Sequence, residues 1–118
     1  MTIKLSQRLI DDLIDDAIAA GRAAGLGVVP QPMYIQGYAP VMDGACGFAW
    51  VNVKPANSAV AKRLVARGMA RKDGYYGGVT VWISDYNQSM TRKEAHARAF
   101  AATLAAAGIR AYSASRMD

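Results

Sequence analysis

From residue 47 to residue 118, segments with strand-like and helix-like patterns alternate, and this alternation limits the fold more than any other feature. GFAWVNV and VTVWIS place apolar residues at alternating positions, which is typical of strands, and IRAYSAS predicts a last strand. SAVAKRLVARGMA and the alanine-rich run over 92–107 repeat apolar residues every three or four positions, which predicts helices. We therefore expect a β-α-β-α-β unit over 47–118, in which parallel neighbouring strands would be joined by right-handed crossovers.

The N-terminal segment over 1–25 predicts an amphipathic helix that Ser6 caps and that ends near Gly25. Its apolar stripe consists of Leu9, Ile10, Leu13, Ile14, Ala17 and Ile18. Four acids lie opposite that stripe, at Asp11, Asp12, Asp15 and Asp16. Because no second acidic cluster or neighbouring histidine accompanies them, we interpret them as a solvated face and expect no metal site.

Residues 27–46 contain three prolines and three glycines, which favours a connector with at most one short edge strand at MYIQGY. At 118 residues, the whole chain predicts a single domain. With so few strands, we expect an α/β two-layer sandwich of a three- to four-stranded sheet and its helices, with α+β as the alternative class.

Charge is unevenly distributed along a chain of net charge +5. Residues 51–118 carry eleven lysines and arginines against four acids, whereas residues 1–50 carry three against five. This asymmetry fits an anionic partner such as nucleic acid, and it fits equally well a surface kept soluble beside an acidic helix.

The sequence does not favour a catalytic centre. Cys46 is the single cysteine, which excludes an intramolecular disulfide and a cysteine-based zinc site and favours a reducing cytoplasm. His96, the only histidine, is expected to be buried and hydrogen-bonded, so a Cys46–His96 nucleophilic pair is not favoured. Asp73 and Asp85 flank a strand instead of sharing a face, so a hydrolase that uses paired carboxylates is not favoured. We expect no catalytic residue and no cofactor, and the absence of an apolar run near 20 residues predicts no membrane span.

Two polar loops, 54–58 and 84–89, could form an anion site. If the strands that precede them are parallel, both loops leave the same sheet edge and lead into helix N-termini, where backbone N–H groups favour phosphate. Tyr75 and Tyr76 could stack on a base, or instead form a half-buried lid over a turn made by Gly77 and Gly78. The alternative for the loops is that these side chains cap helices and turns. The predicted ligand-binding residues are Lys54, Asn57, Ser58, Tyr75, Tyr76, Ser84, Tyr86, Asn87, Gln88 and Ser89.

Basic and aromatic side chains suggest where a partner would bind. Arg63, Arg67 and Arg71 follow at four-residue steps with Lys72 beside them, which predicts a basic patch. Aromatic residues interleaved with cations hold single strands and nucleotides, but they also mark protein interfaces. The aromatic residues in question are Trp50, Tyr75, Tyr76, Trp82, Tyr86 and Tyr112.

The segments GACGFAWV and YYGGVTVWISDYNQSMTRKEAHARAFAATLAAAGIRAYSASRMD resemble a group of small uncharacterised proteins of tailed phages and prophages. The resemblance covers about residues 44–118. It implies a protein of the bacterial cytoplasm that acts during infection, either as an accessory factor or in counter-defence, and it brings no catalytic motif.

These observations favour a non-enzymatic phage accessory protein that binds a nucleotide or nucleic acid through its loops. The alternative is an inhibitor that binds a host protein through the aromatic face, and a small enzyme ranks third. We also expect a homo-oligomer, because the wide apolar stripe of the first helix must be covered.

Overall fold

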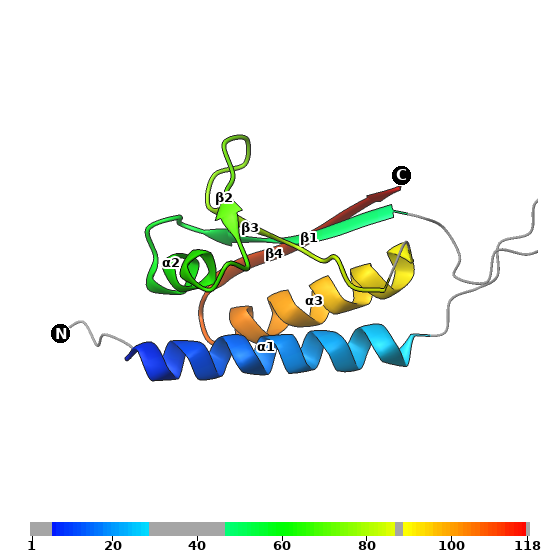
Figure 1. Cartoon of the computed structure of the whole chain (residues 1–118), viewed down its shortest axis with the longest axis horizontal. Helices are drawn as coiled ribbons and strands as arrows, with labels where there is room; N and C mark the ends of the chain where they lie inside the picture. Colours follow the sequence, from blue (N-terminus) through cyan, green and yellow to red (C-terminus); the bar gives the residue numbers. More distant parts are fainter. Residues whose placement is uncertain (1–5, 29–46, 87–88, 118) are drawn as a thin grey trace, which may run out of the picture.

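The computed structural model describes residues 6–28, 47–86 and 89–117, which form three helices and one four-stranded sheet (Figure 1). This confirms the expected α/β class with a small sheet and an N-terminal amphipathic helix. In chain order the elements are α1 (Gln7–Gly27), β1 (Gly47–Lys54), α2 (Ala59–Ala66), β2 (Arg71–Lys72), β3 (Val79–Trp82), α3 (Met90–Ala106) and β4 (Arg110–Met117). None of the described helices is long and apolar enough to cross a membrane. Most of the predicted connector, with MYIQGY and Cys46, lies outside the described residues.

The strands are antiparallel throughout, in the order β2-β3-β1-β4. Parallel pairing of β1 and β3 is therefore wrong. The reason is β2, a two-residue edge strand that sequence analysis missed: after β1 and α2, the chain runs along β2 and turns back before it enters β3. From β1 onward the connectivity is the β-α-β-β-α-β arrangement of ferredoxin-like folds, with α1 added in front.

The turn between β2 and β3 is organised by the carboxylate of Asp73. Its Oδ1 accepts hydrogen bonds from the backbone N–H groups of Tyr75 and Tyr76, at 2.8 and 2.9 Å, and its Oδ2 accepts one from Thr80 Oγ1 at 2.7 Å. These bonds to the charged form lower the pKa of Asp73, the Tyr76 N–H contributing most. Gly77 has a φ of 77°, in the left-handed region that glycine adopts without strain, which confirms the predicted glycine turn.

The helices cover one face of the sheet in two levels. Helix α3 lies against β1 and β4, and α1 lies against α3 on the side away from the sheet (Figure 1). The core between them is built from alternate residues of β1 and β3 and from one face of each helix. It includes Ile10, Ile14, Ala49, Val51, Val53, Leu64, Val79, Val81, Phe100 and Leu104.

The stripe of α1 is covered within one chain. Ile10, Ile14 and Ala17 are buried, whereas Leu9 is exposed. The structure thus removes the reason for which we expected a homo-oligomer, although the oligomeric state itself stays a prediction. The acids opposite the stripe are not simply solvated, because Asp11 and Asp15 form ion pairs with α2.

Serine side chains cap the N-termini of the three described helices. Ser6, Ser58 and Ser89 accept hydrogen bonds from the backbone N–H groups of Leu9, Ala61 and Arg92, respectively. The cap expected at Ser6 is confirmed. The sequence leaves Asn57 and Ser58 as alternative caps of the second helix, and the structure shows that Ser58 is the cap. For α3, the spacing of Thr91 and Glu94 predicts a capping box, and this is wrong because the helix begins one residue before Thr91.

Candidate functional site

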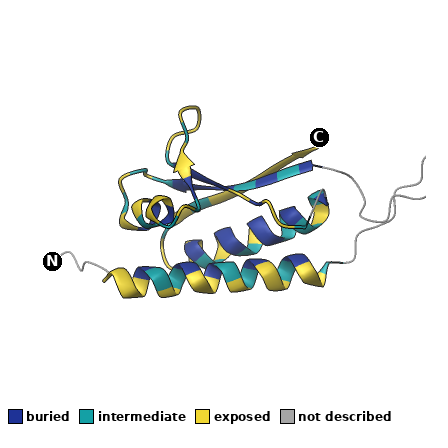
Figure 2. Ribbon diagram, in the orientation of Figure 1, coloured by how far each residue is buried: buried dark blue, intermediate teal, exposed yellow. Residues whose placement is uncertain are grey.

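The sheet face opposite the helices is open within the described part of the chain. Alternation along the strands and the cross-strand register place one set of side chains there together. Strand β4 is exposed along almost its whole length (Figure 2). We call this surface the open face; it consists of Phe48, Trp50, Asn52, Lys54, Arg71, Thr80, Trp82, Arg110, Tyr112, Ala114 and Arg116, with Tyr76 reaching it from the turn.

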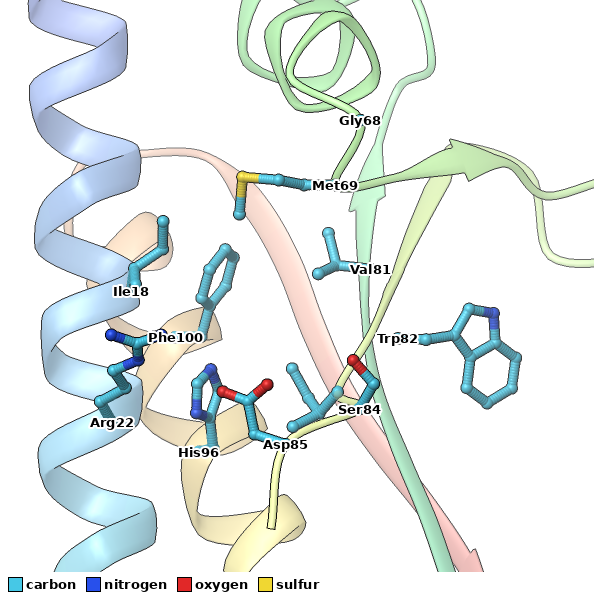
Figure 3. Close-up of a pocket in the computed structure, with 11 residues that line it drawn as sticks. Ile18, Arg22, Gly68, Met69, Val81, Trp82, Ser84, Asp85, His96 and Phe100 are labelled. Carbon is cyan, nitrogen blue, oxygen red and sulfur yellow. The ribbon is translucent and has the colours of Figure 1, made fainter. Parts of the chain in front are cut away.

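Aromatic rings occupy the centre of the open face. Trp50 and Trp82 are cross-strand partners with ring centroids 5.1 Å apart, and Trp82 remains 55% exposed. Tyr112 is 54% exposed, from the neighbouring strand. Figure 3 shows Trp82 pointing to the opposite side of β3 from Phe100. The two central strands therefore present large rings to the surface and keep small apolar side chains for the core.

Four cations surround these rings: Lys54, Arg71, Arg110 and Arg116. No ion pair within the described ranges involves any of them. The guanidinium of Arg116 lies 5.5 Å from the centre of the Phe48 ring, a cation–π distance. Helix α1, with its acids, lies on the far side of α3 from the sheet. One acid does border the open face: Asp73 accepts a hydrogen bond from Thr80, and Lys54 helps to lower the pKa of Asp73.

The predicted basic patch is split by the structure. Arg63 forms a bidentate ion pair with Asp11, with Nε–Oδ1 at 2.7 Å and Nη2–Oδ2 at 3.1 Å. Arg67 reaches Asp15 at 2.7 Å. The hydrogen bond from Arg63 holds the pKa of Asp11 below its usual value. These two arginines attach α2 to α1, and acids of α1 offset their charge, whereas Arg71 lies on the open face without an ion pair among the described residues.

Lys72, the last member of that patch, belongs to the helix side. Its register partner is Val79, whose side chain is buried, and it lines a shallow pocket with Asn57 and Lys62. Asn57 itself is exposed. Neither residue is placed beside the rings of the open face.

The two predicted ligand loops do not share an edge. In the register, Val53 pairs with Val79 and Trp50 with Trp82, so the end of β1 lies beside the start of β3. Loop 54–58 and loop 84–89 therefore leave opposite ends of the sheet. Ser58 and Ser89 are occupied as helix caps, as the alternative interpretation expected. Asn87 and Gln88 lie outside the described residues.

Tyr75 and Tyr76 extend from the turn and form an edge-to-face pair with centroids 4.6 Å apart. They are 86% and 57% exposed, so the half-buried lid that we considered is wrong. Tyr76, unlike Tyr75, borders a pocket on the open face. Of the predicted ligand residues, Lys54 and Tyr76 are thus brought together with the aromatic centre.

That pocket has a volume of about 220 Å³ and lies over Asn52. It is lined by Trp50, Asn52, Lys54, Tyr76, Tyr112 and Ala114. Asn52 is only 7% exposed, and its Oδ1 has no hydrogen-bond partner among the described residues. An unpaired polar atom in a residue that lines an aromatic pocket is an arrangement that can orient a ligand.

A second pocket, of about 350 Å³, lies on the helix side of the sheet (Figure 3). Its walls include His96, Asp85, Arg22 and Ser84. His96 is buried as expected, and its Nδ1 is 2.7 Å from the hydroxyl of Tyr86. No hydrogen bond joins His96 to Ser84 or Asp85 in the described part of the chain. The histidine and Tyr86 therefore hold the helices together, and the predicted ligand role of Tyr86 gains no support.

Sequence analysis recognised Trp50, Trp82 and Tyr112 as a partner-binding group but did not include Asn52, Arg110 or Arg116. Alternation along GFAWVNV and IRAYSAS puts Asn52 and Arg110 each on a face, whereas Arg116 lies just beyond the predicted strand. Only the antiparallel register places these residues on one surface. No family model, curated protein or solved structure was found to match the chain.

Proposed function

We propose that this protein binds single-stranded nucleic acid on the open face of its sheet. The observation that carries the proposal is a group of rings on three adjacent strands: Trp82 and Tyr112 are exposed, and Trp50 on the strand between them is half-buried. Bases stack on aromatic side chains whatever their sequence, and each stacked base contributes about 1–3 kcal/mol. A nucleic-acid strand that lies across the sheet could stack its bases on several of these rings at once.

The surrounding cations support the same ligand. Lys54, Arg71, Arg110 and Arg116 form no ion pair among the described residues and lie around the rings, where the phosphates of a bound strand would pass. Lys54 lies near an acid, Asp73, whose pKa it helps to lower. In a duplex the bases are already stacked and paired, so rings on an open sheet favour single strands. RNA-recognition motifs also stack bases on a four-stranded sheet, a parallel that is an analogy of architecture and not of descent.

The proposal also includes the biological role of this binding. The phage and prophage resemblance suggests a bacterial cell under infection, where single strands arise from both phage and host. We propose a non-enzymatic accessory role, with counter-defence as one form of it.

The two tryptophans of the sequence make a direct test practical, because both lie on the open face. Titration with a single-stranded oligonucleotide of about 12 nucleotides should quench tryptophan fluorescence as the bases stack. A Trp82→Ala variant should bind about 5- to 100-fold more weakly, the equivalent of one lost stacking contact. Leu26→Ala, which removes an exposed apolar side chain from α1, is the matched control and should bind like the unmodified protein.

Two results would count against the proposal. A duplex of equal length that binds as tightly as the single strand would show that charge alone determines binding. If no oligonucleotide changes the fluorescence, the open face does not bind nucleic acid, and the same rings become the candidate surface for the alternative, a host protein partner.

A further inference from the structure

We infer that the pocket over Asn52 binds one nucleobase of the strand and selects bases that carry an exocyclic amino group. This inference rests on the proposed function. It adds a preference among bases to a surface that would otherwise bind any single strand by stacking.

The internal hydrogen bonds of Asn52 determine which of its atoms is free. Its Nδ2 donates to the carbonyl oxygen of Gly77 at 2.9 Å and to Thr80 Oγ1 at 3.4 Å. A carbonyl oxygen can only accept, so the nitrogen of the amide must face Gly77. Thr80 Oγ1 donates its own hydrogen to Asp73 Oδ2 at 2.7 Å, and it can therefore accept from Nδ2. The amide is thereby held in one orientation, in which Oδ1 has no hydrogen-bond partner among the described residues.

Oδ1 is buried and lacks a partner within residues 6–28, 47–86 and 89–117. An acceptor in this position is costly to leave unpaired, so a group that donates to it gains the energy of a hydrogen bond made away from water. Both hydrogens of Nδ2 are already used, so the Asn52 amide can accept a hydrogen bond from a ligand but cannot donate one. An asparagine that recognises adenine usually both donates to the base and accepts from it, whereas Asn52 can only accept.

The walls of the pocket suit a flat aromatic ring. Trp50 and Lys54 flank Asn52 along β1, Tyr112 is its cross-strand partner, and Tyr76 borders the pocket from the turn. Rings on three sides provide stacking and edge contacts to a base, and the Lys54 ammonium lies at the margin, where a phosphate would be. The volume of about 220 Å³ accommodates a single base.

The recessed position of Oδ1 favours an amino group over a ring N–H. An exocyclic amino group projects beyond the ring, as on C4 of cytosine, and so extends farther toward a buried oxygen than a ring N–H does. The N3–H of uracil lies between two carbonyl oxygens, which would be brought close to Oδ1 without any donor to satisfy them. Cytosine and uracil therefore form a matched pair, because they differ at C4 and N3 while ring size and strand charge are the same.

The experiment compares oligo(dC) and oligo(dU) of equal length by tryptophan quenching at neutral pH. We expect oligo(dC) to bind about fivefold more tightly, the effect of one additional net hydrogen bond. Equal affinities, or tighter binding of oligo(dU), would overturn the inference while leaving the proposed function intact. If neither oligonucleotide quenches the fluorescence, the proposed function itself fails.

Two variants test whether Asn52 is responsible. Asn52→Ala should bind both oligonucleotides with equal affinity. Thr80→Val removes a partner of Nδ2 but leaves Oδ1 in place and Gly77 to orient it, so the preference for oligo(dC) should persist. A ratio that is unchanged in Asn52→Ala, or lost equally in both variants, would show that Oδ1 does not read the base.

Discussion

At the scale of single residues, His96 shows how burial and one hydrogen bond fix the state of a side chain. The ring is buried between α3 and α1, and its Nδ1 bonds to the Tyr86 hydroxyl. Burial lowers the pKa of His96 by disfavouring its charged form; Asp85 raises the pKa and Arg22 lowers it, both with smaller effect. Burial also raises the pKa of Tyr86. The pair is therefore neutral near pH 7.

We predict that protein stability falls as the pH drops below about 6.5, the ordinary histidine value. The unfolded chain takes up a proton at His96 in that range and the folded chain does not, so protonation favours unfolding. Urea unfolding at about pH 7.5 and 5.5 should show a lower midpoint at acid pH, above the range in which carboxylates titrate. In His96→Asn this pH dependence should largely disappear. A wild-type midpoint that does not change between these pH values would contradict the prediction.

Two residues illustrate what the sequence can and cannot predict at this scale. A buried, hydrogen-bonded His96 is expected because it precedes Phe100 by one helical turn on the inner side of α3, and this is confirmed. The environment of Asn52 could not be expected. Its partner Gly77 is 25 residues away in a turn, and its exposure depends on side chains from two other strands.

At the scale of elements, α1 and α3 approach closely because two residues of α1 have no side chain. A Cβ placed on Gly21 would lie 2.7 Å from the His96 ring, and one on Gly25 would lie 2.6 Å from the Tyr86 ring. These glycines are one helical turn apart and both are buried. They make room for the His96–Tyr86 pair at the contact between the helices.

We predict that Gly21→Ala destabilises the protein by about 1–2 kcal/mol, because overpacking against the fixed imidazole exceeds the roughly 1 kcal/mol gained in helix propensity. Gly27→Ala is the matched control, since a Cβ there meets nothing within 4 Å. It should leave the urea midpoint unchanged or raise it. A Gly21→Ala variant as stable as Gly27→Ala would mean that α1 moves away from α3 at little cost.

Element types were predictable from apolar spacing, whereas strand direction was not. The alternation of 47–118 predicted three of the four strands and the helices α2 and α3, and the apolar stripe of 1–25 predicted α1, all within a few residues of their observed ends. The missing strand, β2, has only two residues, both charged, and thus no apolar pattern. Because one short strand reverses the chain, its omission led to parallel pairing and to a shared edge for two loops that lie at opposite ends of the sheet.

At the scale of the whole molecule, charge is separated between layers. The acids of α1 lie on the helical side, where Asp11 and Asp15 are paired with arginines of α2. The open face carries four cations that form no ion pair in the described part of the chain. The charge asymmetry along the sequence thus becomes an asymmetry between two sides of the fold. Sequence analysis predicted the excess of positive charge but placed it mainly along the second helix, because ion pairs between distant segments leave no pattern in the sequence.

We predict that binding of a single strand depends on the cations of the open face and weakens steeply with salt. Each phosphate contact should add about −0.7 to the slope of log affinity against log salt, so contacts from several cations give a slope near −2 to −3. Reversing Arg110 and Arg116 to Glu should reduce both the affinity and the slope. Both residues lie on the exposed strand β4, and neither forms an ion pair within the described residues, so the fold should tolerate the change.

Lys62 on α2 provides the matched control for this charge reversal. It is exposed and basic but lines pockets on the helix side, so Lys62→Glu changes the net charge without changing the open face. If overall charge alone attracts the strand, one reversal at Lys62 should weaken binding about as much as one reversal at Arg116. If the open face binds the strand, Arg116→Glu weakens binding and flattens its salt dependence, while Lys62→Glu leaves both nearly unchanged. Equal effects of the two single variants would therefore contradict a binding surface on the sheet, even if the protein proved to bind nucleic acid.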